Sequence, residues 1–228
     1  MDDSALTAIL QLADSFFPSG MVTLSHGLEA FISLQPQSRE EVSHLLWDYL
    51  TGKVAPLDLV TYAHAHRSAA AADLERLLSI DRQLTVSLVP QELRQGSARS
   101  GRAMLETLTP IVNSHLLHAF ARAVKTGRSD GNTSVCLGLL CALWQVPLRA
   151  GGSVLLYTFA VSFLSAALRL GCLGHREVQR ILLEVRPHFS ALLSTALERD
   201  LDEMGAFAPL ADIRAMQHAY LPVRLFSS

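Results

Sequence analysis

A run of 19 residues, Ala150–Leu168, contains no charged side chain. That length is enough for a membrane-spanning helix. A helix that is apolar on all sides is also what the centre of a large helical domain requires. The run contains two glycines, three serines and a threonine, and no belt of aromatic and basic residues flanks both ends. We therefore predict a buried core helix, with an integral membrane protein as the alternative.

Apolar residues recur at helical spacing along most of the chain. Such stripes cover residues 42–50, 178–185 and 189–197. Residues 38–41 (SREE) have the Ser–Glu spacing of a capping box and predict a helix start there. Pro187 is expected to kink or restart the helix between the last two stripes.

Other boundaries are predicted from proline, glycine and hydroxyl residues. Thr109-Pro110 has the pattern of an N-cap with a first-turn proline and predicts a helix that continues through Val124. Gly127 is expected to end that helix. In the uncharged run, Ser153 is the expected N-cap and Gly171 the expected end.

Strand signals are weak, because no run of β-branched residues alternates with polar ones between turn signals. About ten helical segments fit the sequence, joined by short links at 33–37, 52–56, 87–90, 127–131 and 147–152. We predict an all-α fold, one helical-bundle-like domain over residues 1–228 with an extended C-terminal tail.

Both ends of the chain differ from its middle. Residues 16–20 (FFPSG) interrupt the first helix with a proline and a glycine. Residues 221–228 form the tail, which contains the large apolar side chains of Leu225 and Phe226. A terminal tail usually frays unless it docks. We therefore expect this one to dock, either on its own domain or on a partner.

Charge and cysteine content limit the function classes. The chain has 19 Lys and Arg against 21 Asp and Glu, a net charge of −2, which disfavours a general nucleic-acid binder. Three cysteines are too few for a disulfide scaffold and fit a reducing, cytoplasmic location. Asp2 and Asp3 stand where a secretory signal carries positive charge.

A search for catalytic motifs finds none. Gly96 and Gly101 have the spacing of a phosphate-binding loop, but Arg102-Ala103 follows where Lys and Ser or Thr are needed. The Gly-x-Ser-x-Gly nucleophile elbow of serine hydrolases is absent too. The sequence therefore favours a helical binding or scaffold protein.

Nine histidines require a search for metal sites. His115 and His118 are three residues apart, so they share a helix face and are weak candidate metal ligands. Two ligands do not make a closed site, and surface histidines are the simpler interpretation. An all-α enzyme with a buried metal stays as an alternative.

The helix expected to begin near Pro90 has small residues on one side, at 96–101. Glycine inside a helix costs roughly 1 kcal/mol against alanine, so close contact on this face is expected to offset that cost. Tight packing within the domain is the favoured interpretation, and a partner surface is the alternative.

Four blocks of sequence carry a resemblance. Residues 10–15 (LQLADS), 18–20 (PSG) and 25–29 (SHGLE) open the chain. Residues 92–101 (ELRQGSARSG) form the second block, and residues 165–171 (SAALRLG) with Gly174 and Gln179 form the third. The last block is Asp212-Ile213, Met216, His218 and Arg224-Leu225-Phe226. In this order the blocks resemble the UreF family of urease accessory proteins across the whole chain. Ala219, Ser227 and residues 207–209 (FAP) depart from the family pattern.

The resemblance implies an all-α protein without activity of its own that acts in nickel insertion into urease. It implies three partners: a scaffold called UreD or UreH, the nickel-carrying GTPase UreG, and apo-urease. UreF-like proteins are thought to bridge these partners, to dimerise and to influence GTP hydrolysis, so nickel and GTP would be held by partners. Residues 96–101 are one possible dimer seam.

The resemblance also implies partner-binding residues, and Arg224 and Phe226 are the strongest because arginine and aromatic side chains dominate binding surfaces. The others are Leu225, Tyr220, His218, Arg214, Asp14, Ser15, Pro18, Gly20, His26, Glu29, Glu92, Arg94, Ser97, Gly101 and Arg169. Local structural roles, such as turn formation and helix capping, are the alternative for the N-terminal members. For Arg169 the alternative is contact with last-turn carbonyls.

Overall fold

The computed structural model describes residues 1–34 and 38–227, and all regular secondary structure in these residues is helical. The α-helices are α1 (Asp3–Ala13), α2 (Leu28–Leu34), α3 (Arg39–Tyr49), α4 (Val60–Ala70), α5 (Leu74–Ser87), α6 (Gln91–Leu108), α7 (His115–Lys125), α8 (Thr133–Leu143), α9 (Leu148–Arg169), α10 (His175–Val185), α11 (Phe189–Ala196) and α12 (Pro209–His218). Three short 3-10 helices are η1 (Met21–Thr23), η3 (Arg186–His188) and η4 (Leu201–Glu203), and η2 (Leu50–Leu59) is a π-helix. The all-α prediction is confirmed. The predicted link at 33–37 and residue 228 of the tail lie partly or wholly outside the described residues.

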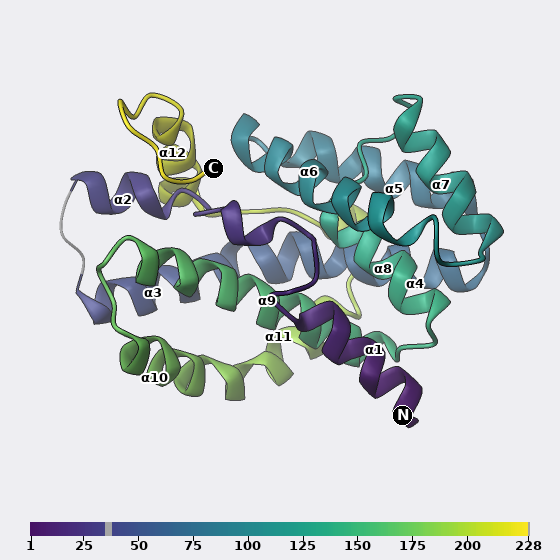
Figure 1. Ribbon diagram of the computed structural model, residues 1–228, viewed down its shortest axis with the longest axis horizontal. Coiled ribbons are helices and arrows are strands. Elements are labelled where there is room, and N and C mark those ends of the chain that lie inside the picture. The colour runs from purple at the N-terminus through teal and green to yellow at the C-terminus, as the bar shows by residue number, and fades with distance from the viewer. Residues whose placement is uncertain (35–37, 228) are drawn as a thin grey trace.

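Helix α9 runs through the middle of the molecule (Figure 1). Helices α1, α8, α10 and α11 all pack against it. Its most apolar stretch is long enough to cross a membrane, yet it is mostly buried inside the domain. Phe163, Leu164 and Leu156 are completely inaccessible to solvent. The prediction of a core helix for the uncharged run is confirmed.

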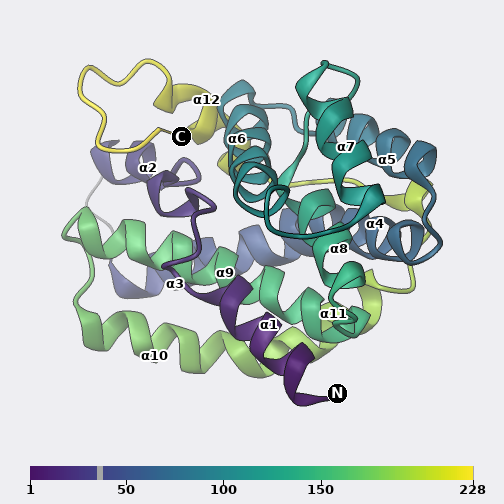
Figure 2. The ribbon, with the colours of Figure 1, turned by 45° about the vertical axis from the view of Figure 1, so that its right-hand side comes forward.

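Small residues allow α8 to lie close to two other helices. A Cβ on Gly138 would come within 2.9 Å of the Ala65 Cβ on α4, so α4 and α8 pack almost backbone to backbone. On the other side α8 packs against α6, where a Cβ on Gly101 would lie 2.0 Å from the Gly131 carbonyl oxygen. Helix α8 thus contacts both α4 and α6, and the three helices lie together in the same part of the molecule (Figure 2).

Four predicted boundaries are confirmed. Ser38 and Glu41 form the capping box of α3. Residues 186–188 around Pro187 separate α10 from α11 as a 3-10 turn. Gly127 and Gly171 follow α7 and α9 with φ angles of +75°, the left-handed conformation that glycine adopts without steric cost.

Two predicted helix starts are wrong. Thr109 is the C-cap of α6, because buried Leu105 and Leu108 keep that helix wound to its apolar end, and Ser114 caps α7 instead. Ser153 lies inside α9 and donates its hydroxyl hydrogen to the Arg149 carbonyl. The N-cap of α9 is Pro147, so the predicted link at 147–152 is helical.

The predicted link at 52–56 is also wrong, because π-helix η2 covers it. A strap of extended chain (residues 204–208) crosses η2 between η4 and α12. Its Phe207 N–H donates to the Gly52 carbonyl at 2.7 Å, and its Gly205 N–H donates to the Pro56 carbonyl at 3.1 Å. A Cβ at Gly52 would lie 2.7 Å from the Phe207 carbonyl oxygen, so glycine is what lets the strap come this close. The strap leads the chain to α12.

Candidate functional site

Helix α12 turns its small side chains toward the domain. Ala211, Ala215 and His218 are buried, and they recur at i, i+4 and i+7 on one face. The backbone of Ala215 lies against Gly27, where a Cβ would be only 3.0 Å from the Ala215 nitrogen. Helix α12 therefore packs on α2 and α6 through its narrowest side chains.

The opposite face of α12 is apolar and exposed to solvent. Leu210, Ile213 and Met216 have exposed fractions of 54%, 50% and 43%, and Tyr220 just beyond the helix has 88%. We call these four residues the α12 apolar stripe. A surface helix of a self-sufficient domain normally places its large apolar side chains inward. The reversed pattern of α12 marks a surface suited to another protein.

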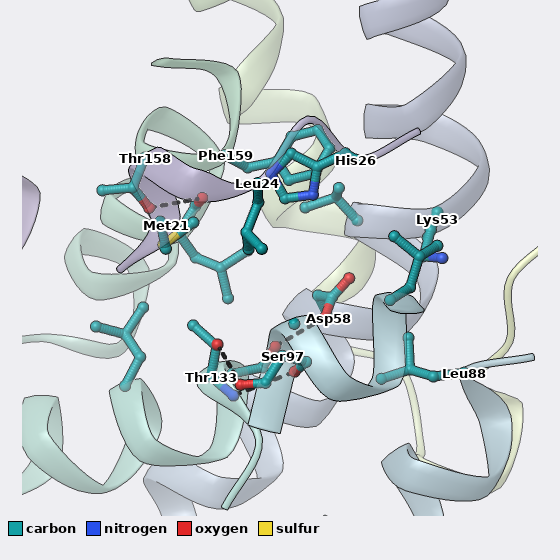
Figure 3. A pocket seen from close by; sticks show the side chains of 16 residues that line it. Met21, Leu24, His26, Lys53, Asp58, Leu88, Ser97, Thr133, Thr158 and Phe159 are labelled. Carbon is teal, nitrogen blue, oxygen red and sulfur yellow. Dashed lines mark hydrogen bonds between the residues drawn. The ribbon is translucent and has the colours of Figure 1, made fainter. Parts of the chain in front are cut away.

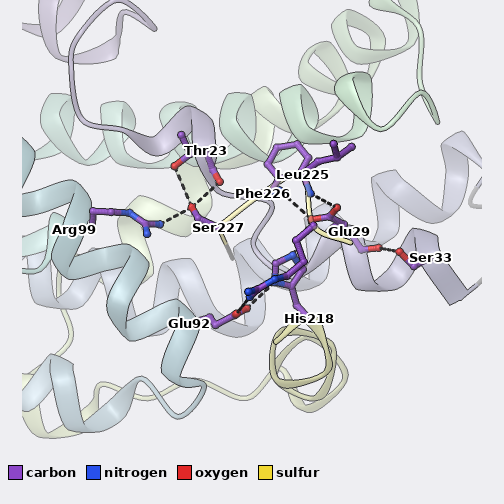
Figure 4. Close-up of polar contacts among 10 residues, drawn as sticks. Thr23, Glu29, Ser33, Glu92, Arg99, His218, Leu225, Phe226 and Ser227 are labelled. Carbon is purple, nitrogen blue, oxygen red and sulfur yellow. Dashed lines mark hydrogen bonds and ion pairs between the residues drawn. The ribbon is translucent and has the colours of Figure 1, made fainter. Parts of the chain in front are cut away.

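Four ionisable side chains join α12, α2, α6 and the tail (Figure 4). His218 is fully buried, with its Nδ1 2.7 Å from Glu92 Oε2 and its Nε2 2.8 Å from Glu29 Oε2. Arg224 donates to the other oxygen of Glu92 at 2.9 Å. We call Glu29, Glu92, His218 and Arg224 the charge cluster. With both acids ionised and His218 protonated, its net charge is zero.

Glu29 also holds the backbone of the tail. Its Oε1 accepts the Leu225 N–H at 2.7 Å, and its Oε2 accepts the Phe226 N–H at 3.2 Å. Next in the chain, Ser227 donates its N–H and its hydroxyl to the Thr23 carbonyl, and Arg99 donates to the Ser227 hydroxyl. The tail therefore docks on its own domain, one of the two alternatives left by the sequence, and contact of the tail with a partner stays a prediction.

Lys53 fixes α12 at its other end. Its ammonium lies 3.4 Å from Asp212 Oδ1, and the Lys53 side chain is 8% exposed. On its other side Lys53 lines a largely apolar cavity with His26 and Asp58 (Figure 3). Burial, followed by the positive charge of Lys53, lowers the pKa of His26 to about 3, so this imidazole is neutral. Burial raises the pKa of Asp58, although a hydrogen bond from Ser134 and the charge of Lys53 oppose that rise.

The N-terminal motif forms a separate turn. The Asp14 carboxylate accepts the Phe16 N–H at 2.9 Å, and its carbonyl accepts the Phe17 N–H. Gly20 has a φ of +69°, while Ser15 and Pro18 are exposed. These residues have the local roles that the sequence offered as the alternative, and partner contact by them stays a prediction. His26 belongs to the core instead, with its Nε2 3.3 Å from the Ser162 hydroxyl.

The small face of α6 is used inside the domain. The Thr133 hydroxyl donates to the Ser97 carbonyl, and Gly101 lies against the loop before α8. Arg94 donates to the Leu88 and Val89 carbonyls at the end of α5. Internal packing was the favoured interpretation, and it is confirmed. A dimer seam at 96–101 stays a prediction.

The two candidate metal ligands do not form a site. His115 is exposed, and His118 Nδ1 lies 2.6 Å from the Ser114 carbonyl. Among the described residues there is no group of three or more His, Cys, Asp or Glu side chains that could hold a metal ion.

Sequence analysis named Glu29, Glu92, His218 and Arg224 as candidate site residues, but it did not indicate that their side chains contact one another. It did not indicate Arg99, Thr23 or Lys53, each of which anchors the tail or α12. The buried face of α12 could have been predicted from the sequence, because Ala211, Ala215 and His218 have helical spacing.

Comparison with known proteins identifies the family. The model of the UreF family matches residues 37–186. A urease accessory protein UreF of Trichodesmium erythraeum is 33% identical over all of this chain and 98% of its own length. The chain belongs to the UreF family. UreF 1 of Brucella melitensis is 30% identical over 97% of the chain and 92% of its own length. UreF of Actinobacillus pleuropneumoniae is 29% identical over 98% of the chain and 99% of its own length.

Membership of the UreF family establishes the general function of the chain. It is a urease accessory protein that takes part in urease maturation, and proteins of this family are not catalytic. The family assignment thus supports the expectation of no enzymatic activity. The relatives match nearly the whole chain, so the match extends over the charge cluster and α12 as well as the helices of the core.

Proposed function

We propose that this UreF-family chain is a cytoplasmic scaffold that binds a UreD/UreH-type accessory protein through the α12 apolar stripe and the exposed side of the tail. In this proposal it brings that protein together with a UreG-type GTPase and apo-urease during nickel insertion, and it acts as a homodimer. Nickel and GTP are bound by the partners, and the scaffold influences GTP hydrolysis only through contact.

The observation that carries the proposal is the reversed amphipathicity of α12. Leu210, Ile213 and Met216 face solvent on a helix whose inner face is alanine. In the tail after Tyr220, Val223 and Leu225 are 77% and 72% exposed as well. Exposed large apolar side chains, together with an arginine such as Arg224, are typical of protein interfaces.

The shape of the tail suits this use. The tail bends at residues 222–223 and 225–226, so the predicted extended tail is wrong, and it buries Phe226 while Leu225 is exposed. Docking on the domain thus orders the tail before a partner arrives, which lowers the entropy cost of binding. The proposed interface is consequently a prepared surface that comprises α12 and the outer side of the tail.

Co-expression with a UreD/UreH-type partner tests this proposal. We expect the full chain to retain the partner during purification and a chain that ends at Tyr220 to lose it. A UreG-type GTPase should then join the complex formed by the full chain and should not join that of the truncated chain. Equal recovery of the partner by both chains would contradict the assignment of the tail, and failure of both to bind would contradict the choice of partner.

A further inference from the structure

Helix α7 has only basic residues on its exposed face. The exposed residues of this helix are His115, His118, Arg122 and Lys125. They recur at i, i+3, i+7 and i+10, so they form one stripe along the helix. No Asp or Glu occurs in residues 107–129, although the whole chain has a net charge of −2. This part of the surface is therefore basic on a chain that is slightly acidic.

An open groove lies between this stripe and α6. Its floor is apolar, because Leu105 of α6 and Ala121 and Val124 of α7 line it. Three long cationic side chains also line it, namely Arg102, Arg122 and Lys125, and all three are exposed to solvent. We call the groove lined by these six residues the α7 groove. It combines an apolar floor with charged groups at its edge.

The positive charge of the α7 groove is not balanced within the domain. Arg122 and Lys125 take part in no ion pair among the described residues. Arg102 lies 3.7 Å from the Asp130 carboxylate. Glu106 is the one acidic residue that lines the groove, so the lining has a formal charge of +2 with histidine neutral. Two cations at the edge thus remain available to a partner.

We propose that the α7 groove docks an acidic amphipathic segment of a partner protein. The apolar side chains of that segment cover Leu105, Ala121 and Val124, and removal of this surface from water favours binding. Its carboxylates pair with Arg122 and Lys125, which guides the encounter and fixes the orientation of the segment. The methylene stems of the two cations extend the apolar contact, because long basic side chains bury their stems and keep their charge at the edge.

The two features of the groove together define this occupant. A nucleic acid or a free phosphate would pair with the cations and leave the apolar floor in water, and the net charge of the chain disfavours phosphate backbones. A wholly apolar segment would cover the floor without pairing with Arg122 or Lys125. An acidic segment with an apolar face satisfies both the floor and the edge.

The α7 groove is separate from the docking surface on α12. Helices α7 and α12 lie on opposite sides of α6 in both views (Figure 1, Figure 2). Helix α6 contacts each of them. A partner at the groove and a partner at the α12 apolar stripe can therefore bind at the same time. This second surface goes beyond the proposed function, because it requires neither α12 nor the tail.

A designed peptide tests the groove on the full chain. The probe is a fluorescein-labelled peptide of two heptads, with leucine on one helical face and glutamate at the other positions. The matched probe has lysine in place of every glutamate. By fluorescence anisotropy we expect the glutamate peptide to bind at least tenfold more tightly than the lysine peptide, with an affinity that falls as salt is added. Amide shifts in NMR should map its site to residues 102–110 and 118–127.

Variants of the chain separate the edge of the groove from its floor. Arg122→Gln combined with Lys125→Gln removes the two unpaired charges and should weaken the glutamate peptide at least tenfold. Ala121→Gln places a polar side chain over the floor and should also weaken it. Arg176→Gln combined with Arg180→Gln, at two exposed arginines of α10, is the matched control and should bind like the wild type. Urea unfolding checks that each variant keeps its fold.

Three results would overturn the proposal. One is equal affinity for the glutamate and lysine peptides, and another is wild-type affinity in the double variant of α7. The third is a single-stranded DNA oligonucleotide of equal charge that binds the groove more tightly than the glutamate peptide, which would make it a nucleic-acid site.

Affinity for a UreD/UreH-type partner keeps this proposal apart from the proposed function. The double variant of α7 should bind that partner like the wild type, because α12 and the tail are unchanged. If it does so and loses the glutamate peptide, the groove is a second and independent surface. Loss of both would contradict the separation of the two surfaces.

Discussion

The guanidinium carbon of Arg169 lies 4.2 Å from the centroid of the Phe226 ring. Arg169 is the last residue of α9, and Phe226 comes near the end of the chain, so the contact joins the core helix to the tail. Phe226 is 6% exposed, while its neighbour Leu225 is 72% exposed. An arginine over an aromatic face is a cation–π contact, and here it covers a buried apolar side chain of the tail.

Phe226→Ala is expected to release the tail while α12 stays in place. The substitution removes the ring under Arg169 and leaves the N–H contacts with Glu29 to hold the tail alone. We expect the Ser227 amide, which donates to the Thr23 carbonyl, to lose at least tenfold in hydrogen-exchange protection, or about 1.4 kcal/mol. Leu225→Ala is the matched control and should leave the protection unchanged. Equal loss in both variants would contradict the assignment.

The fold class could be predicted from the sequence mainly because of the uncharged run that forms α9. An uncharged run of this length has to be surrounded by other helices or by lipid, and amphipathic stripes elsewhere supplied the surrounding helices. Caps that rely on local contacts, such as the Ser38–Glu41 pair, were also predictable. Thr109 and Ser153 misled because each has the residue type of a cap, while burial of neighbouring side chains kept its helix continuous.

The site was predicted as a set of residues and not as an arrangement. Glu29 and Glu92 are 63 positions apart in the sequence, and Glu92 and His218 are 126 apart, so no local pattern indicates that they touch. The resemblance to a family named them. Their mutual contacts, and the strap that carries α12 across η2, depend on tertiary packing that sequence periodicity does not contain.

Gly101→Ala is expected to destabilise the domain strongly. A Cβ there would lie 2.0 Å from the Gly131 carbonyl oxygen, so α6 and α8 have to move apart. Such overpacking costs about 1–3 kcal/mol or more, which exceeds the roughly 1 kcal/mol that alanine gains in a helix. Gly174→Ala is the control, because only a flexible Glu177 oxygen at 3.4 Å lies near its Cβ. Urea unfolding should show a lower midpoint for Gly101→Ala alone.

Asp81→Ala is expected to lower the free energy of unfolding by about 3 kcal/mol or more. The fully buried Asp81 carboxylate accepts hydrogen bonds from the loop before α8, and its removal leaves several buried donors unpaired. The donors are the Ser129 hydroxyl, the N–H groups of Asp130, Gly131 and Asn132, and the Asn132 amide.

Asp73→Ala provides the comparison for Asp81. Asp73 is the exposed N-cap of α5, accepts one N–H from Arg76, and should cost about 1 kcal/mol. Equal unfolding free energies for the two variants, measured in urea, would show that the buried carboxylate does not hold the loop.

His26 gives the domain a stability that falls in acid. Its pKa in the folded protein is lowered to about 3, below the ordinary value near 6.5. Between these values the unfolded chain binds a proton that folded His26 does not, so stability decreases as the pH falls, by up to about 1.4 kcal/mol per pH unit. From pH 6.5 to pH 5 the loss is about 1.6 kcal/mol.

His26→Asn is expected to remove this part of the pH dependence. Asparagine tolerates the positive φ of 54° at this position and does not titrate. Urea unfolding at pH 6.5 and pH 5 should show a smaller difference for the variant than for the wild type. His175→Asn, at an exposed histidine, should keep the wild-type difference. Identical differences for His26→Asn and the wild type would show that His26 is not the group responsible.

The affinity for a UreD/UreH-type partner, measured by calorimetry with Ile213→Glu, tests the central claim most directly. Ile213 lies in the middle of the α12 apolar stripe and is half exposed, so the change should leave the fold intact. Leu183→Glu on α10, where the leucine is 59% exposed, introduces the same charge at an apolar surface position away from α12. We predict at least a tenfold weaker complex for Ile213→Glu and wild-type affinity for Leu183→Glu. Wild-type affinity for Ile213→Glu would contradict the claim that α12 is the docking surface.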